Sequence, residues 1–258
     1  MIRIGISGAA GRMGKSVAAV ISRGKDFKIA ALVERKGHEL VGKEVEGVKV
    51  TDDLESVVND IDVYIDFSVP QASLEALEIL SSAGKAHVLA TTGFTKEELL
   101  KIDEAAKKIP VVFASNYSVG VNVMWKVLDQ VTRIMKDDYD IDIVESHHRH
   151  KKDAPSGTAV TCAQVIMDAK GLDYDENVIY GRDGRDNERP RNQLGVFAVR
   201  GGGVIGEHTV MYMSDEDKLE IKHTIFSRDA LAAGAVKAAK FINGKKAGLY
   251  SMKDVLGL

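Results

Sequence analysis

The first part of the chain alternates short apolar runs with amphipathic segments. The runs at 2–7 and 27–33 are rich in aliphatic residues and predict buried strands. After the first run, Val17, Ala18 and Ile21 are spaced as on one face of a helix. The alternation continues with strands expected at 63–68, 87–94 and 111–114 and helices at 54–58, 71–83 and 96–108. This order predicts an α/β fold with a Rossmann-like, doubly wound parallel sheet.

The pattern changes after a long helix expected at 121–135. From there strands dominate, at 141–145, 194–200, 204–213 and 219–227. In the last strand apolar and polar residues alternate, as in a sheet with one buried and one solvent-exposed face. We expect a second α+β domain on an open mixed sheet, whose apolar face packs against another subunit. The polar, proline-interrupted segment 182–192 is predicted to be a mobile loop.

The end of the chain is predicted to return to the first domain. A helix at 228–243 carries small apolar residues at helical spacing, which suits packing against the first sheet. The predicted dinucleotide-binding domain is therefore 1–118 with 228–258. The predicted substrate-binding and oligomerisation domain is 119–227.

Composition narrows the classes of function. With 258 residues, 45% of them hydrophobic, the chain can bury a substantial core. A net charge of −3 gives no support for nucleic-acid binding, and a single cysteine excludes an intrachain disulfide framework. Met1 leads directly into a strand-like run, and no apolar run is long enough to span a bilayer. We expect a cytoplasmic protein without nucleic-acid or membrane partners.

Three glycines follow the first expected strand and suit phosphate binding. Gly8 permits a sharp turn, Gly11 allows the backbone to approach a pyrophosphate, and Gly14 allows close packing of helix on strand. The spacing G-x-x-G-x-x-G is a variant of the usual dinucleotide pattern, and glycine turns also occur for purely local reasons. The flanking strand and helix favour the dinucleotide interpretation.

The end of the second expected strand carries residues suited to the adenosine ribose. Glu34 lies twenty residues after Gly14, where a carboxylate can accept a hydrogen bond from the 2′-hydroxyl. Arg35 follows, and a guanidinium there suits a 2′-phosphate. Both NADH and NADPH are therefore expected as cofactors. The ends of three later strands should line the same crevice, at 67–68, 91–93 and 114–116.

A cationic block connects an expected strand to an expected helix. The six residues 147–152 are all basic or can become so, and a Pro-Ser-Gly-Thr turn follows at 155–158. Ser156 or Thr158 is placed to cap the helix, whose free N–H groups attract anions. This arrangement predicts a site for a small carboxylated molecule, with imidazoles available to move protons. A solvated surface or a nucleic-acid patch is the alternative, although neutral histidine contributes little charge at pH 7.

Other kinds of site and enzyme remain as alternatives. A zinc site at His147, His148 and His150 is disfavoured because a strand places adjacent residues on opposite faces, so no metal is expected. Cys162 lies in an apolar helical run and is better explained as a buried hydrophobe than as an aldehyde dehydrogenase nucleophile. A sugar or cyclitol dehydrogenase would commonly carry Glu-Lys-Pro after the strand that ends here at 89–93, and the lysine is absent. A non-catalytic NADPH sensor would leave the cationic block without a purpose.

Several of these segments together resemble the dihydrodipicolinate reductase family over nearly the whole chain. They are the residues at 8–14, 91–93, 115–120, 145–159 and 206–209, of which the block H-H-R-H-K-x-D-A-P-S-G-T-A is the most specific. The resemblance implies reduction of 4-hydroxy-tetrahydrodipicolinate in diaminopimelate and lysine biosynthesis. It also implies a homotetramer whose domains close over bound ligands. The chain departs from the family at 184–190, where a glycine-rich segment is usual.

The resemblance also implies roles for individual residues. His147 would be the general acid, and Lys151 would hold the substrate and stabilise developing negative charge. His148, Gly157 and Thr158 would bind a substrate carboxylate. Neighbouring cations should resist protonation of His147 until the dianion binds. The cofactor crevice would comprise Gly8, Ala10, Gly11, Arg12, Met13, Glu34, Arg35, Phe67, Thr91, Gly93, Ser115, Asn116, Tyr117 and Arg228.

Overall fold

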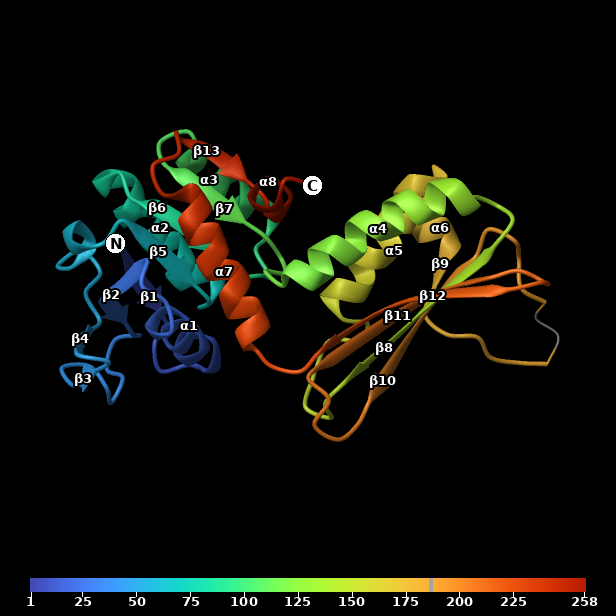
Figure 1. The fold of residues 1–258 in the computed structure, drawn as a ribbon, viewed down its shortest axis with the longest axis horizontal. Helices are drawn as coiled ribbons and strands as arrows, with labels where there is room; N and C mark the ends of the chain where they lie inside the picture. The colour runs from blue at the N-terminus through green and yellow to red at the C-terminus, as the bar shows by residue number, and fades with distance from the viewer. Residues whose placement is uncertain (186–187) are drawn as a thin grey trace. The chain divides into compact units, whose positions relative to one another are not determined.

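The computed structural model describes residues 1–185 and 188–258, and these form two compact units. The first unit joins Met1–Val119 with Arg228–Leu258, and the second unit is Gly120–Ser227. The helix α7 (Asp229–Ile242) therefore belongs to the first unit, together with the strand β13 (Gly248–Tyr250) and the helix α8 (Met252–Leu256). Each unit is described by itself below (Figure 1).

The first unit is built on one sheet with the strand order β13-β7-β6-β5-β1-β2-β4-β3. Its pairs are parallel except for β3 with β4. Because β1 lies between β2 and β5, the chain reverses its direction of winding there, and ligands bind at such a point in doubly wound sheets. The bounds are β1 (Ile2–Ser7), β2 (Phe27–Val33), β3 (Glu44–Val45), β4 (Val48–Thr51), β5 (Val63–Asp66), β6 (Ala86–Leu89) and β7 (Pro110–Phe113).

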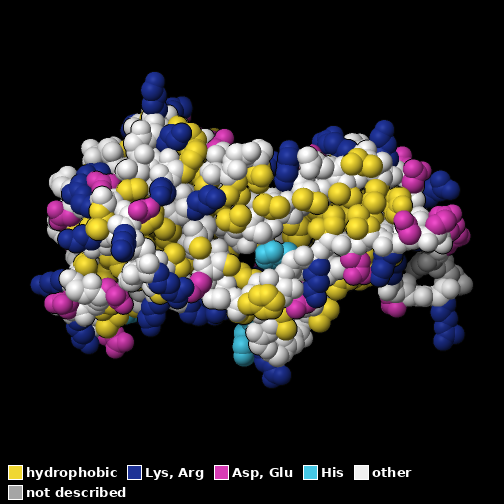
Figure 2. All heavy atoms as spheres, viewed as in Figure 1, with side chains coloured by type: hydrophobic (Ala, Val, Ile, Leu, Met, Phe, Trp, Pro, Cys, Tyr) yellow, Lys and Arg dark blue, Asp and Glu magenta, His cyan; other side chains and the backbone are white. Residues whose placement is uncertain are grey.

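Helices cover both faces of this sheet. One core contains residues of α1 (Arg12–Ser22), α7 and α8 packed on the strands. The other contains residues of α2 (Pro70–Ala83) and α3 (Lys96–Ala106). Acidic and basic side chains are interspersed over the face of this unit seen in Figure 2, without a continuous basic patch there.

The second unit is built on a mixed sheet with the strand order β12-β11-β8-β10-β9. The central strand β8 pairs parallel with β10 and antiparallel with β11. Helices α4 (Val119–Met135, which begins at the last residue of the first unit) and α5 (Gly157–Lys170) pack on one face (Figure 1). The remaining bounds are α6 (Tyr174–Asn177), β8 (Asp140–His147), β9 (Val178–Ile179), β10 (Leu194–Arg200), β11 (Gly206–Met213) and β12 (Lys218–Ile225).

Two predicted elements of the first unit differ from the structure. The helix predicted at 54–58 is wrong, since the segment forms turns followed by the 3-10 helix η1 (Val58–Asp60). The cause is local: Asp53 accepts a hydrogen bond from the Ser56 N–H, and the Ser56 hydroxyl donates to the Asp53 carbonyl. The strand predicted at 87–94 ends at Leu89, because its neighbours β5 and β7 also end opposite that residue.

The segment predicted to be a loop at 182–192 contains residues 186 and 187, which lie outside the described part of the chain. At its start, the Arg182 guanidinium donates to both oxygens of Asp142, at 2.8 and 3.0 Å. Near its end, Arg189 pairs with Asp140 and Asp142 at 3.2 Å. Both ends of the described segment are therefore tied to β8.

Candidate active site

The turn between β1 and α1 has the geometry of a phosphate-binding loop. Gly8 has φ +59°, and a Cβ on Gly14 would lie 2.3 Å from the Gly8 carbonyl oxygen. Helix α1 begins at Arg12 after Gly11, which supplies no side-chain cap. The first N–H groups of α1 are thus not capped by a side chain, and helix starts of this kind bind phosphate.

The Glu34 carboxylate lies beside this glycine turn and is fixed by backbone hydrogen bonds. It accepts hydrogen bonds from the Ala10 N–H at 2.7 Å and the Arg35 N–H at 3.2 Å. A cavity of about 430 Å³ opens here, and Gly8, Glu34 and Arg35 line it. The predicted ribose-binding residues therefore lie together beside the glycine turn, and a dinucleotide fits the residues present. Ser68, from the strand end expected at 67–68, also lines the cavity, and so does Asp52, which the sequence had not singled out for this role.

A second group of predicted residues lies at the ends of β5 to β7. The rings of Phe67 and Tyr117 lie 6.0 Å apart in an edge-to-face arrangement. The Tyr117 hydroxyl donates to backbone carbonyls at the ends of β6 and β7. The Thr91 hydroxyl accepts a hydrogen bond from the Ser73 hydroxyl at 2.8 Å. The strand ends are thus joined into one polar and aromatic group.

The remaining predicted cofactor residues lie at several other positions of the first unit. Arg12 is exposed, whereas Met13 packs against the core of the first unit. Ser115 is exposed, and the Asn116 side chain accepts from the Ser118 N–H. The two other residues are the exposed Gly93, with φ +89°, and Arg228, which is the N-cap of α7.

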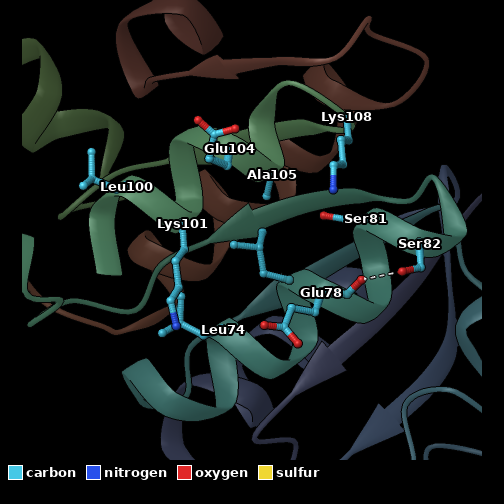
Figure 3. Close-up of a pocket in the computed structure, with 10 residues that line it drawn as sticks. Leu74, Glu78, Ser81, Ser82, Leu100, Lys101, Glu104, Ala105 and Lys108 are labelled. Atoms are coloured by element: carbon cyan, nitrogen blue, oxygen red, sulfur yellow. Dashed lines mark hydrogen bonds between the residues drawn. The ribbon is translucent and has the colours of Figure 1, made fainter. Parts of the chain in front are cut away.

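A larger hollow of about 590 Å³ lies elsewhere in the first unit. It is formed between α2 and α3, with Leu74, Glu78 and Lys101 among its lining residues (Figure 3). The Ser82 hydroxyl donates to the Glu78 carbonyl along its edge. Because α2 and α3 cover a face of the sheet, this hollow is not at the strand ends where doubly wound folds bind nucleotides. Volume alone therefore does not select the cofactor site.

In the second unit, His147 is the last residue of β8 and is buried against Glu145. The Nδ1 atom of His147 lies 2.6 Å from Oε2 of Glu145, which is completely buried. Arg200 donates to both carboxylate oxygens of Glu145 at 2.7 Å, and the Ser156 N–H donates to Oε1 at 2.9 Å. Hydrogen bonds from Arg200, His147 and Ser156 hold the pKa of Glu145 below its ordinary value, although burial acts to raise it.

His208 on β11 lies beside His147. The two rings are 5.2 Å apart, and Nε2 of His208 lies 2.9 Å from the Ser156 hydroxyl oxygen. Burial, together with the neighbouring His147, lowers the pKa of His208 to about 4. Burial also lowers the pKa of His147. The Glu145 carboxylate opposes that shift, and the positive charges of Lys151 and Arg200 add to it. The predicted resistance of His147 to protonation thus has burial as its largest cause.

The predicted substrate-binding residues surround the start of α5. Ser156 is the N-cap and accepts from the Ala159 N–H at 3.3 Å, so Gly157 and Thr158 form the first turn of the helix. The Lys151 ammonium pairs with Asp153 at 2.9 Å. The buried Nδ1 of His148 has no hydrogen-bond partner among the described residues. Cationic and N–H donors are therefore brought together here for an anionic ligand.

Sequence analysis missed three residues of this cluster. Glu145 and His147 are two apart in a strand and must share a face, so their pairing could have been recognised from the spacing. Arg200 and His208 come from β10 and β11, which pair with β8 opposite His147 and Glu145, respectively. Only the strand register brings these two residues to the site.

Among the residues that the structure describes, no helix has the length and apolar character needed to cross a membrane. Across 1–185 and 188–258, no group of three or more His, Cys, Asp or Glu side chains is arranged to hold a metal ion.

Comparison with protein-family models matches both units. Residues 2–117 match the model described as "Dihydrodipicolinate reductase, N-terminus". Residues 120–256 match "Dihydrodipicolinate reductase, C-terminus".

Curated relatives and solved structures agree with this match. A 4-hydroxy-tetrahydrodipicolinate reductase of Citrifermentans bemidjiense is 44% identical over 266 aligned residues, and one of Pseudomonas fluorescens is 46% identical over 267. Both alignments cover 100% of each chain. A dipicolinate-bound dihydrodipicolinate reductase from Paenisporosarcina sp. TG-14 has a similar fold, with a TM-score of 0.79, 23% identity and 98% of each chain covered. The chain therefore belongs to the dihydrodipicolinate reductase family of NAD(P)H-dependent oxidoreductases.

Proposed function

We propose that this protein reduces 4-hydroxy-tetrahydrodipicolinate to tetrahydrodipicolinate, with NADH or NADPH as the reductant, in diaminopimelate and lysine biosynthesis. The observation that carries the proposal is the full-length identity of 44–46% to relatives named for this activity. The donors around α5 are of the type that a dicarboxylate ring requires. The solved relative whose title names bound dipicolinate is consistent with such a ligand.

Lys151 and the start of α5 would hold the substrate. The two carboxylates stay charged throughout the reaction, so they need donors that remain positive or polar at neutral pH. The Lys151 ammonium supplies a charge, and the backbone N–H groups of Gly157 and Thr158 supply the partial charge of a helix start. Binding of the substrate would exchange the Asp153 partner of Lys151 for a substrate carboxylate.

His147 would supply the proton that completes the reduction. Loss of the 4-hydroxyl group as water would give a conjugated cyclic imine. A reduced nicotinamide held by the first unit would supply the hydride, and the far end of the conjugated system would then carry negative charge that a proton must neutralise. The His147 imidazolium would protonate that position, and general acid catalysis of this kind contributes about 10²–10⁴-fold. A substrate dianion would offset the cations that lower the pKa of His147, and so favour the acid form when the site is filled.

The cofactor would occupy the first unit. Glu34 is placed to accept from a ribose 2′-hydroxyl, and Arg35 is placed to bind a 2′-phosphate, so we propose that both cofactors are used. In this assignment 1–118 with 228–258 bind the dinucleotide, and 119–227 bind the substrate and form subunit contacts.

We also propose a cytoplasmic homotetramer. The sheet of the second unit has α4 and α5 on one face, and side chains such as Val199 are exposed on the other. Val199 is 50% exposed, and Phe226 beside the end of β12 is 87% exposed. Apolar groups of this kind favour contacts between subunits.

A coupled assay tests the proposal. The product of the preceding synthase is added to the purified protein with NADH or NADPH, and loss of the reduced cofactor is followed by absorbance. We expect oxidation that depends on the substrate and is inhibited competitively by dipicolinate. Cofactor binding without any substrate-dependent oxidation would instead indicate a nucleotide sensor.

A further inference from the structure

We propose that Glu145, clamped by Arg200, is the positioning residue that orients His147 so that its proton leaves from Nε2. This inference rests on the proposed function, which makes His147 the proton donor. The orientation itself is a property of the second unit alone, so it can be tested without turnover.

The first argument is the hydrogen bond between the two side chains. An ionised carboxylate can only accept, so Nδ1 of His147 carries the hydrogen in its 2.6 Å contact with Glu145. The neutral ring is therefore the Nδ1–H form, and the protonated ring carries its second hydrogen at Nε2. Transfer of that hydrogen forms the new C–H bond of the substrate and leaves the ring neutral. Nδ1 still donates to Glu145, and water can reprotonate Nε2.

The second argument is that Glu145 cannot turn away. Each carboxylate oxygen accepts from a different nitrogen of Arg200 at 2.7 Å, and Oε1 also accepts from the Ser156 backbone. Arg200 is fixed in turn by the Asp153 carbonyl at 2.6 Å. Two strands and the N-cap of α5 thus hold one carboxylate, which is 0% exposed. A charge buried to this degree is tolerated only when its partners are fixed.

The third argument is the space left at Nε2. A Cβ on Gly206 would lie 3.0 Å from His147 Nε2 and 3.4 Å from its Cδ2. Glycine at the start of β11 therefore leaves the Nε2 edge of the ring free of a side chain from that direction. The His208 ring packs edge-on at 5.2 Å and limits rotation of the imidazole.

Titratable and charged groups near His147 come from its own strand, from both strands paired with it and from the loop that follows. Glu145 lies on its own strand, Arg200 on β10, His208 on β11 and Lys151 in the following loop. His223 lies opposite His208 on β12. Among these groups Glu145 carries the negative charge, and it raises the pKa of His147 against burial and the cations. Loss of the Glu145 charge should therefore lower the pKa of His147 and reduce the fraction of the ring that is protonated at a given pH.

Glu145→Gln tests the proposal because it keeps the size of the side chain and removes its charge. In the ligand-free protein, nitrogen NMR of His147 should show the Nδ1–H form in the wild type and loss of that preference in the variant. Its pKa should fall by about one unit or more. With substrate, kcat should fall about tenfold or more while KM changes less than about threefold, and the high-pH limb of the kcat profile should move to lower pH.

Two further variants keep the test decisive. Glu176→Gln makes the same substitution at an exposed site in α6 and should leave the nitrogen shifts and pKa of His147, kcat, KM and the pH profile unchanged. Should Glu145→Gln fail to fold, Arg200→Lys is the second variant. It retains the positive charge but removes the bidentate hydrogen bonds to Glu145, and it should lower kcat with little change in KM. Unchanged His147 nitrogen shifts in Glu145→Gln, or an unchanged kcat in a folded Arg200→Lys, would overturn the proposal. Absence of turnover in the wild type would count against the proposed function and leave the NMR result valid.

Discussion

At the scale of single residues, His147 is placed between two opposing effects on its proton. Burial favours the neutral ring, and the adjoining Glu145 carboxylate favours the charged ring. Burial and the positive charges of Lys151 and Arg200 prevail, so the pKa of His147 lies below its ordinary value. An anionic ligand that offsets these charges would raise that pKa and favour the acid form, which the proposed proton donor must reach.

Replacement of His147 by glutamine should separate chemistry from cofactor binding. We expect His147→Gln to lower kcat by about 10²–10⁴-fold, because the proposed proton donor is lost. The dissociation constants of NADH and NADPH, measured by calorimetry or fluorescence, should be unchanged, since the residues proposed to bind them belong to the first unit. A kcat within about threefold of the wild type would contradict the role of His147.

His208 should make the protein less stable in acid. The unfolded chain binds a proton at His208 below its ordinary pKa of 6.5, whereas the folded protein does not until about pH 4. The free energy of unfolding should therefore fall as the pH falls between these values, by up to about 3 kcal/mol from this residue.

Urea denaturation across that pH range measures the effect. His208→Gln removes the titrating group, so its stability should depend less steeply on pH than that of the wild type. His150→Gln, at an exposed histidine in the same unit, should retain the wild-type slope. Equal slopes in the wild type and His208→Gln would show that His208 does not titrate with folding.

At the scale of elements, α7 packs on the first sheet through a contact that requires glycine. A Cβ on Gly234 would lie 1.7 Å from the backbone oxygen of Tyr117. Helix α7 approaches the segment between β7 and α4 this closely because Gly234 has no side chain. The same approach buries Ala235 and Ala239 completely.

Gly234→Ala should therefore destabilise the first unit. Because the obstructing atom is backbone, the helix or the segment at Tyr117 must move, and we expect a loss of about 2–4 kcal/mol in the free energy of unfolding. Thermal and urea denaturation measure this loss. Ala233→Ser, on the exposed side of the same helix, should cost less than about 1 kcal/mol.

Most elements could be predicted from hydrophobic periodicity, because each buries one face. The strand at 194–200 and the helix at 96–106 agree with prediction closely. The structure of the segment 54–58 could not be predicted from periodicity, since hydrogen bonds between Asp53 and Ser56 compete with a helix there. The glycine turn, Glu34 and the cationic block were visible as local patterns. Arg200 and His208, which lie beside Glu145 and His147, were not visible in this way, because strand pairing brings them to the site.

At the scale of the whole molecule, the face of the second sheet opposite α4 and α5 carries exposed apolar side chains such as Val199. We propose that another subunit covers this face. Val199 pairs in register with Ser146 on that face, whereas its neighbour Arg200 pairs with His147 on the helix-covered face. Alternation along β10 thus divides the strand between the proposed subunit contact and the His147 cluster.

Val199→Lys should weaken the proposed assembly. A charge in the middle of an apolar contact is costly to bury, so sedimentation at micromolar concentration should show smaller species than in the wild type. Ile134→Lys, at a position on α4 that is 80% exposed, should leave the assembly unchanged. A wild-type sedimentation profile for Val199→Lys would place the contact elsewhere.

Because α7 packs on the sheet that begins with β1 and β13 forms an edge strand of it, the order of synthesis matters. The ribosome synthesises every strand of the second unit before α7 and β13. The nascent chain must then keep the apolar surface around Ile4 and Val17 soluble until residues 228–258 emerge. Chaperones that bind exposed aliphatic surface would meet this protein at that stage.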